Sequence, residues 1–306
     1  MKPVEEPLRP LAVPSQSEPV PQEGVVERIP PWPPWTAPAA LFGGILLAAL
    51  AAVLIELPAL AFGVDVTSSH IPGGLEILDT VVQDAAFVAS AVFFAQLGGR
   101  TVRAWQFGLR PPWTGWAVAV GLVVALFIAF LIFSVIWGSA FHAEKDKLLE
   151  QLGTGESKAL LVLSAALTCV IAPICEEFLF RGYIFTALRN WHGTWPAAII
   201  TGLAFGGVHV GSAPVVDLVP LAGLGFGLCL LYRYTGSLYA CIVAHSLNNS
   251  IAFGSLEGWR WPSVIVLLLA AFAAIGLIAL GLIRAGVITP ETPSAGPDAF
   301  SVASGG

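Results

Sequence analysis

Residues 160–188 read LLVLSAALTCVIAPICEEFLFRGYIFTAL, and they place three charged side chains inside a largely apolar run. The charged residues are Glu176, Glu177 and Arg181. A run of about 20 apolar residues is long enough to cross a bilayer as a helix. A charge at the centre of such a helix costs about 2.5–3.5 kcal/mol on insertion scales. These side chains therefore need partners, a wet cavity or a reaction that uses them.

The rest of the composition agrees with a membrane setting. The chain has 306 residues, of which 56% are apolar and 11% charged, whereas ordinary globular domains carry about 25% charged residues. We therefore expect an all-α integral membrane protein with about eight transmembrane helices around an intramembrane active-site cavity. A net charge of −6 and the lack of a basic stripe give no reason to expect a nucleic-acid partner. The predicted spans are 38–62, 80–99, 113–140, 159–187, 194–211, 215–232, 236–254 and 262–284.

The chain divides into three parts by composition. Residues 1–36 are rich in Pro and Glu and predict a disordered cytoplasmic arm. Residues 37–286 form the predicted polytopic membrane domain, and residues 287–306 a disordered C-terminal tail. Basic residues precede the first span and follow the second, fourth, sixth and eighth, whereas the loop 63–79 has none. This distribution predicts that both termini lie in the cytoplasm.

The two neighbouring glutamates are expected to have different roles. Glu177 and Arg181 are four residues apart on a helix, so they share a face and can form an ion pair. Glu176 is rotated by about 100° from its neighbour, and its own helical neighbours Leu179 and Phe180 offer no charge. It must find its partner on another helix. A desolvated carboxylate in this position is suited to act as a general base.

Two further clusters lie in later spans. His209 ends the sequence Phe205-Gly206-Gly207-Val208-His209, where the glycines allow close approach of another helix or a substrate. By itself this histidine reads as an ordinary core residue. His245 and Asn249 are four residues apart and share a helical face.

These side chains allow more than one chemistry. Glu176, His209, His245 and Asn249 could activate a water and stabilise the oxyanion of an attacked peptide carbonyl. Alternatively, Glu176, His209 and His245 could bind zinc, although the three ligands come from separate spans and no H-E-x-x-H motif is present. A transporter or proton relay would also use intramembrane carboxylates and histidines. The four cysteines lack metal or redox spacing and are expected to be small apolar packing residues.

Taken together, the three clusters resemble the CAAX protease and bacteriocin-processing family of intramembrane proteases. That family is marked by E-E-x-x-x-R, F-x-x-x-H and H-x-x-x-N or H-x-x-x-D. Here the motifs are Glu176 to Arg181, Phe205 to His209 and His245 to Asn249, in that order on separate spans. The resemblance covers about residues 155–255, which would form the protease core.

The resemblance implies an intramembrane endopeptidase that hydrolyses a peptide bond of a membrane-associated or prenylated protein or peptide. Glu176 with His209 would activate the water, and His245 with Asn249 would stabilise the oxyanion. Glu177 and Arg181 would support the site. A metal-free reaction is favoured over zinc because Asn249 is a poor zinc ligand and a good oxyanion donor.

The same resemblance leaves the setting and one rival function open. We expect a multi-pass protein of a bacterial cytoplasmic membrane, with the lipid bilayer and a peptide substrate as its partners. A non-catalytic member of the same fold could instead act as an immunity factor or scaffold. Confinement of the polar residues to the fourth, fifth and seventh spans, without an internal repeat, fits one reaction centre better than a translocation path. It does not separate a protease from a transporter, and the resemblance of the three motifs favours the protease.

Overall fold

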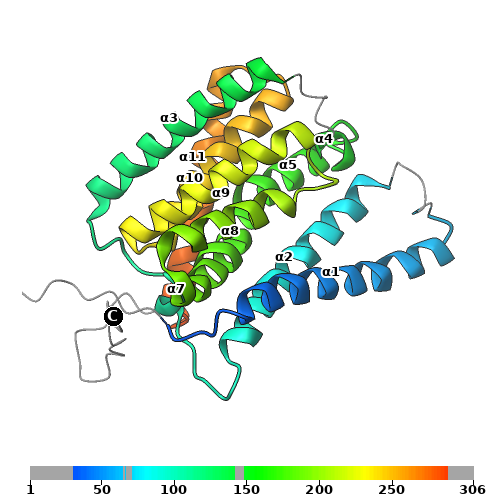
Figure 1. The fold of residues 1–306 in the computed structure, drawn as a ribbon. Helices are drawn as coiled ribbons and strands as arrows, with labels where there is room; N and C mark the ends of the chain where they lie inside the picture. Colours follow the sequence, from blue (N-terminus) through cyan, green and yellow to red (C-terminus); the bar gives the residue numbers. More distant parts are fainter. Residues whose placement is uncertain (1–29, 65, 67–70, 142–147, 289–306) are drawn as a thin grey trace, which may run out of the picture.

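The computed structural model describes residues 30–64, 66, 71–141 and 148–288. Within these ranges every regular element is a helix (Figure 1), so the predicted all-α fold class is confirmed. The longest uniform helices are α1 (Thr36–Ala61), α2 (Gly73–Ala95), α3 (Trp116–Ala140), α9 (Leu218–Thr235), α10 (Leu238–Leu256) and α11 (Trp261–Arg284). Shorter elements are η1 (Ala104–Phe107), α4 (Leu148–Gln151), α8 (Thr194–Gly207) and η4 (Val215–Asp217).

Six described segments are long and apolar enough to cross a membrane, which makes the chain a multi-pass membrane protein. They are Thr36–Ala61, Gly73–Ala95, Trp116–Ala140, Lys158–His192, Val215–Thr235 and Trp261–Arg284. The other two predicted spans are also helices, but they are shorter. Helix α8 has 14 residues, or about 21 Å at 1.5 Å per residue, which is less than the ~30 Å hydrocarbon core. Helix α10 has 19 residues and carries the polar third motif.

The fourth span is not one regular helix. It runs through α5 (Lys158–Ala166), the π-helix η2 (Leu167–Ile171), α6 (Ala172–Glu177), the π-helix η3 (Phe178–Phe185) and α7 (Thr186–His192). The two glutamates end α6, between the π-helical segments. π-Helical segments are rare in proteins, and those that occur are often found at functional sites. The sequence pattern predicted a continuous span here without this change of helix type.

The packed part of the chain begins inside the predicted disordered arm, residues 1–36. Residues 1–29 lie outside the described part, but from Pro30 onward the chain is held against the helices. Trp32 is 2% exposed and its ring lies 4.9 Å from that of Phe107 and 4.8 Å from that of Tyr183. The Asn190 amide donates to the carbonyls of Pro30 and Trp32. A large buried aromatic ring thus fixes the end of the arm.

The C-terminal tail shows the same kind of difference. Most of the predicted tail, 289–306, lies outside the described residues. Ile288, however, is 2% exposed, so the packed domain extends to this residue.

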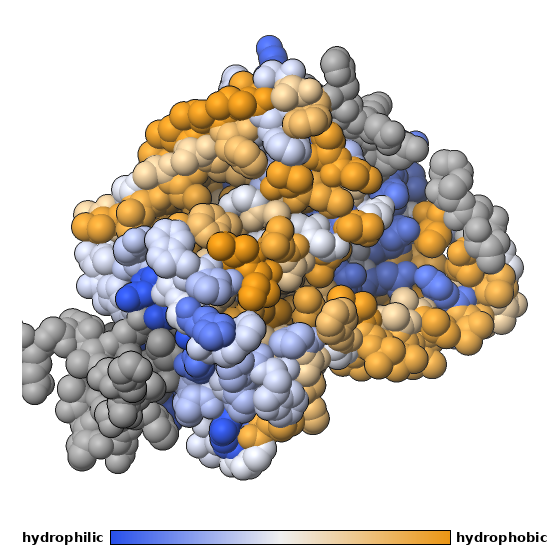
Figure 2. All heavy atoms as spheres, in the orientation of Figure 1, coloured by the Kyte–Doolittle hydropathy of each residue, from blue (hydrophilic) through white to orange (hydrophobic). Residues whose placement is uncertain are grey.

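Helices α1 and α2 form a hairpin on one side of the molecule, and α3, α8, α9, α10 and α11 form the bulk of the other side (Figure 1). Apolar surface covers α3 and α1 in Figure 2, as lipid contact requires. Hydrophilic atoms gather in the hollow between the α1–α2 hairpin and α4–α5 (Figure 2).

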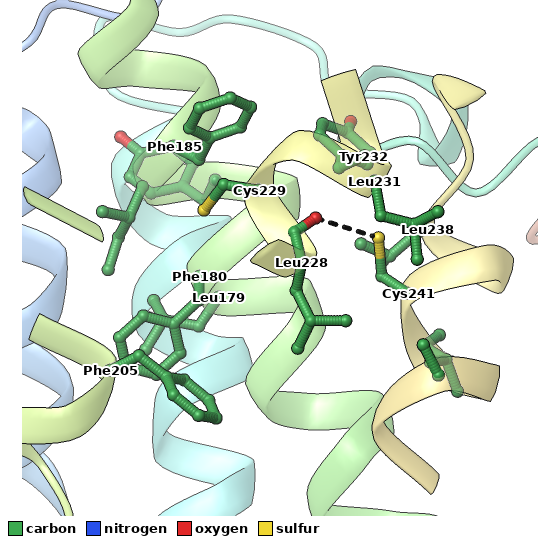
Figure 3. Packing of buried hydrophobic residues seen from close by; sticks show 14 of the residues in the cluster. Leu179, Phe180, Phe185, Phe205, Leu228, Cys229, Leu231, Tyr232, Leu238 and Cys241 are labelled. Atoms are coloured by element: carbon green, nitrogen blue, oxygen red, sulfur yellow. Dashed lines mark hydrogen bonds between the residues drawn. The ribbon is translucent and has the colours of Figure 1, made fainter. Parts of the chain in front are cut away.

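The core lies where η3, α8, α9 and α10 meet. Figure 3 shows Phe180 of η3 beside Phe205 of α8, and Phe185 of η3 beside side chains of α9. All four cysteines are free, and the Cys241 thiol donates to the Leu228 carbonyl at 3.5 Å. As expected of apolar packing residues, Cys169, Cys229 and Cys241 are buried, and Cys175 is partly buried.

Candidate active site

A fully buried ion pair lies at the centre of the fourth span. Glu177 and Arg181 are both 0% exposed, and Arg181 Nη1 donates to Glu177 Oε1 at 2.6 Å. Arg181 Nη2 donates to the Gly225 carbonyl of α9 at 3.0 Å. The ion pair predicted from the four-residue spacing is therefore present, and it also ties η3 to α9. Charge-assisted bonds of this kind are strong, and removal of either partner would leave the other charge buried and unpaired.

The same glutamate also holds the third motif. His245 of α10 places Nδ1 2.8 Å from Glu177 Oε1. Since the carboxylate paired with Arg181 only accepts hydrogen bonds, Nδ1 must carry the proton. This bond fixes the tautomer and the direction of the imidazole ring, as a carboxylate does for the histidine of a hydrolytic triad. The sequence assigned Glu177 a supporting role without showing that it acts on His245.

Glu176 faces the other edge of that imidazole. Its Oε2 atom lies 4.0 Å from His245 Nε2, and its side chain is 14% exposed. Oε2 is buried and has no hydrogen-bond partner within the described chain. A gap of 4.0 Å is too long for a direct hydrogen bond, and a polar contact of this length raises the question of an intervening water. Glu176 thus finds its predicted partner on another helix.

His209 lies differently from the expectation. Helix α8 ends at Gly207, so the histidine sits in the turn beyond the helix rather than deep within a span. Its Nδ1 donates to the Phe205 carbonyl at 2.7 Å, since a carbonyl can only accept. Nε2 is then the nitrogen left for other partners. Among the described residues no ion pair joins His209 to Glu176, and the role of His209 stays a prediction.

Asn249 is hydrogen-bonded to the first π-helix, η2, at a carbonyl to which Pro173 cannot donate. Proline has no N–H, so it cannot bond to the carbonyl four residues earlier, that of Cys169, or five residues earlier, that of Thr168. Side chains of α10 reach both carbonyls. Ser246 Oγ donates to the Cys169 carbonyl at 2.6 Å, and the Asn249 amide donates to the Thr168 carbonyl at 2.9 Å. Asn249 keeps one further amide hydrogen for a ligand.

Phe205, the first residue of the second motif, touches all three clusters. The Arg181 guanidinium lies 4.5 Å from the centre of its ring. The His209 and His245 rings lie 5.0 Å and 5.5 Å from it, centre to centre. Phe205 is 0% exposed. Its ring therefore contacts both imidazoles and the guanidinium of the ion pair, contacts that the motif spacing alone did not indicate.

The glycines of the second motif explain how α8 reaches this position. A Cβ atom on Gly206 would lie 2.6 Å from the Leu218 carbonyl oxygen, so α8 and α9 pack with backbone contact there. Gly207 has open space at the same position. The predicted close approach of another helix is confirmed for the first glycine only.

The alternative of a zinc site fits this arrangement poorly. Within the described ranges, no three His, Cys, Asp or Glu side chains gather as a metal-binding group would require. The third side chain of that set, His209, donates from Nδ1 to the Phe205 carbonyl. Structural and catalytic zinc needs three or four ligands within about 2.0–2.3 Å of one point.

Comparison with known proteins points to one family. The family model for type II CAAX prenyl endopeptidase Rce1-like proteins matches residues 158–251. The Bacillus subtilis protein named "Putative membrane peptidase YdiL" is 30% identical over 138 residues, covering 44% of this chain and 53% of that protein. An uncharacterized protein of Mycoplasma capricolum is 30% identical over 149 residues, covering 43% of each chain.

These similarities are partial in length. The chain covers about half of each of these curated relatives, and no solved structure matches it. The matched segment nevertheless begins at the first residue of α5 and ends just beyond Asn249. Residues 158–251, which hold all three motifs, match the family model of Rce1-like type II CAAX endopeptidases, and the predicted resemblance is confirmed over this segment.

Proposed function

We propose that this chain is an intramembrane endopeptidase in which Glu176 activates the attacking water. The observation that carries the proposal is the chain of contacts Arg181–Glu177–His245, which aims Nε2 of the imidazole at Glu176. A buried carboxylate facing an oriented imidazole is the arrangement that general-base hydrolysis needs. The family match supports the same activity.

The reaction would proceed by addition and elimination at the peptide carbonyl. Glu176 takes a proton from a water while the water oxygen attacks the carbonyl carbon. The resulting oxyanion accepts hydrogen bonds from His245 Nε2–H and from the free amide hydrogen of Asn249. The carbon–nitrogen bond then breaks, and the proton held by Glu176 passes to the departing amine. His209 would assist from the α8 turn by accepting a hydrogen bond at Nε2.

His245 must be an imidazolium to donate from Nε2, because Nδ1 already donates to Glu177. We further propose that the reaction needs no bound metal, since every step above uses side chains of this chain.

The substrate would be a membrane-associated protein or peptide. An apolar groove of about 680 Å³ opens between α5–η2 and α11, and its lining includes Val170 of the π-helix that holds Asn249. A groove of this character suits the apolar part of a lipid-associated or prenylated substrate. The bacterial cytoplasmic membrane is the proposed location.

Cleavage of a fluorogenic library of membrane peptides by purified protein tests the proposal. Wild type should cleave at least one peptide, Glu176→Gln should cleave none, and a strong chelator should leave the wild-type rate unchanged. Equal cleavage by both proteins would remove Glu176 from the mechanism, and loss on chelation would restore zinc. A wild type that cleaves nothing would favour the scaffold or transporter role.

The proposed orientation needs its own measurement. The basic residues that follow alternate spans place both termini in the cytoplasm. A reporter that is active only in the cytoplasm, fused after the last residue, should be active. The same reporter inserted in the loop 63–79 should be silent. The opposite pattern would reverse the orientation.

A further inference from the structure

Helix α2 brings to the active site a carboxyl group that none of the three motifs contains. Asp84 is 1% exposed, although it lies in the middle of a segment that spans the membrane. Neither oxygen of its carboxyl group has a hydrogen-bond partner within the described chain. Buried polar groups in native proteins are almost always bonded. An aspartate without any partner in such a place therefore needs an explanation.

The neighbouring side chain of Glu176 explains why Asp84 is buried without a partner. Helix α2 packs against α6, which ends with the two glutamates. Glu176 is the charged side chain that acts electrostatically on Asp84, and the Cys175 thiol lies in the field of both. Glu176 Oε2 is likewise buried without a partner. Two carboxyl groups with unbonded oxygens thus act on each other electrostatically across the contact between α2 and α6.

The charges nearby decide which of the two carboxyl groups keeps its proton. Arg181 balances Glu177, and an imidazolium at His245 balances an ionised Glu176. No cation within the described chain forms an ion pair with Asp84 that would balance a further negative charge. An unpaired buried carboxylate is strongly disfavoured, and of two carboxyl groups that share a site one keeps its proton. Asp84 is the one without an ion-pair partner.

We propose that Asp84 is a positioning residue of the active site, which holds a proton beside the ionised Glu176 and donates its O–H toward that carboxylate. Asp84 is almost fully buried, whereas 14% of the Glu176 side chain is exposed. Asp84 is therefore the less accessible of the two to a substrate, and it would act through Glu176. Since the two groups are not directly hydrogen-bonded, a water between them would carry the bond to Oε2 and hold the base in one rotamer. This inference rests on the proposed function of Glu176 as the base.

Two substitutions separate this role from a structural one. Asp84→Asn keeps the size, is neutral and retains an N–H donor, so kcat should stay close to wild type. Asp84→Ala removes the donor, and kcat should fall about 10- to 100-fold with KM unchanged. Asp79→Ala is the matched control on the same helix. Asp79 also has an unbonded carboxyl oxygen, but its charged neighbour is Glu56, and its replacement should leave kcat unchanged.

Infrared spectroscopy at neutral pH tests the proton without any substrate. The wild type should show the carbonyl-stretch absorption of a protonated carboxyl group, and Asp84→Asn should lack it. This spectrum decides the protonation of Asp84 even if wild-type protein cleaves no peptide, which would instead count against the proposed function. Identical spectra would overturn the proposal. So would wild-type kcat in Asp84→Ala, or a folded Asp84→Asn as slow as Asp84→Ala.

Discussion

Nδ1 of His245 lies 2.8 Å from Oε1 of Glu177, the same carboxylate oxygen that receives Arg181 Nη1 at 2.6 Å. One atom therefore links the first motif to the third. The two glutamates of the first motif divide the work by their direction: one orients the imidazole through Nδ1, and the other faces Nε2. A rotation of the helix by one residue would exchange these roles, so the order of the pair is fixed by the helix geometry.

The division of roles predicts that two neighbouring substitutions differ in their effect on stability. Glu177→Gln leaves Arg181 buried without its counter-ion, and breaking a buried pair costs about 3–5 kcal/mol. Glu176→Gln removes a carboxylate whose Oε2 has no hydrogen-bond partner, so stability should not fall. Thermal unfolding in detergent should therefore show a lower midpoint for Glu177→Gln only, while both variants lose peptide cleavage. Equal midpoints would contradict the structural role of Glu177.

Phe205 offers a second prediction, because its ring touches Arg181 and both imidazoles. Phe205→Leu should lower the free energy of unfolding by about 1–3 kcal/mol. It should also lower kcat by about tenfold or more, since small displacements of catalytic groups are costly. Phe253→Leu is the control: Phe253 is 1% exposed and packs against Trp259 instead. It should lose similar stability and keep its kcat. Equal loss of kcat in both variants would argue against a special role for Phe205.

The sequence predicted a contact correctly where both residues lie on the same helix. The pairing of Glu177 with Arg181 follows from spacing along a single helix, and most helices lie where long apolar runs predicted them. The identity of the partner of Glu176 could not follow from spacing. It depends on how α10 packs beside α6, which places His245 rather than His209 within 4.0 Å.

The changes of helix type were missed for a related reason. Pro173 is visible in the sequence, but a proline inside a span can kink, bulge or end a helix. The outcome here depends on Ser246 and Asn249, which lie on another helix and bond to the carbonyls left free. Trp32 shows the same limit. Its neighbours suggest a disordered arm, and its burial depends on Phe107 and Tyr183 far along the chain.

The two glycines of the second motif give a third prediction. Gly206→Ala places a Cβ atom 2.6 Å from the Leu218 carbonyl oxygen, which forces α8 away from α9. The expected loss is about 1–3 kcal/mol, as for other overpacked sites. Gly207→Ala meets open space and should be neutral or stabilising by about 0.5–1 kcal/mol. Chemical unfolding of both variants measures the difference, and a destabilised Gly207→Ala would show that the α8 packing is misassigned.

Asn249 gives the last prediction, because its family motif accepts either asparagine or aspartate at this position. In this chain the Asn249 amide donates to the Thr168 carbonyl, which Pro173 leaves without a backbone donor. An ionised aspartate could only accept, so Asn249→Asp would face that carbonyl oxygen with a negative charge. It would also remove a donor to the oxyanion, which is worth about 10²- to 10³-fold in kcat.

We therefore expect Asn249→Asp to lose stability by about 1–3 kcal/mol as well as activity. Asn248→Ala, which gives up only a 3.3 Å bond to its neighbour, should retain most of both. Steady-state cleavage and thermal unfolding of the two variants provide the comparison. Full activity in Asn249→Asp would mean that the amide is not an oxyanion donor, and that the Thr168 carbonyl has a second donor available.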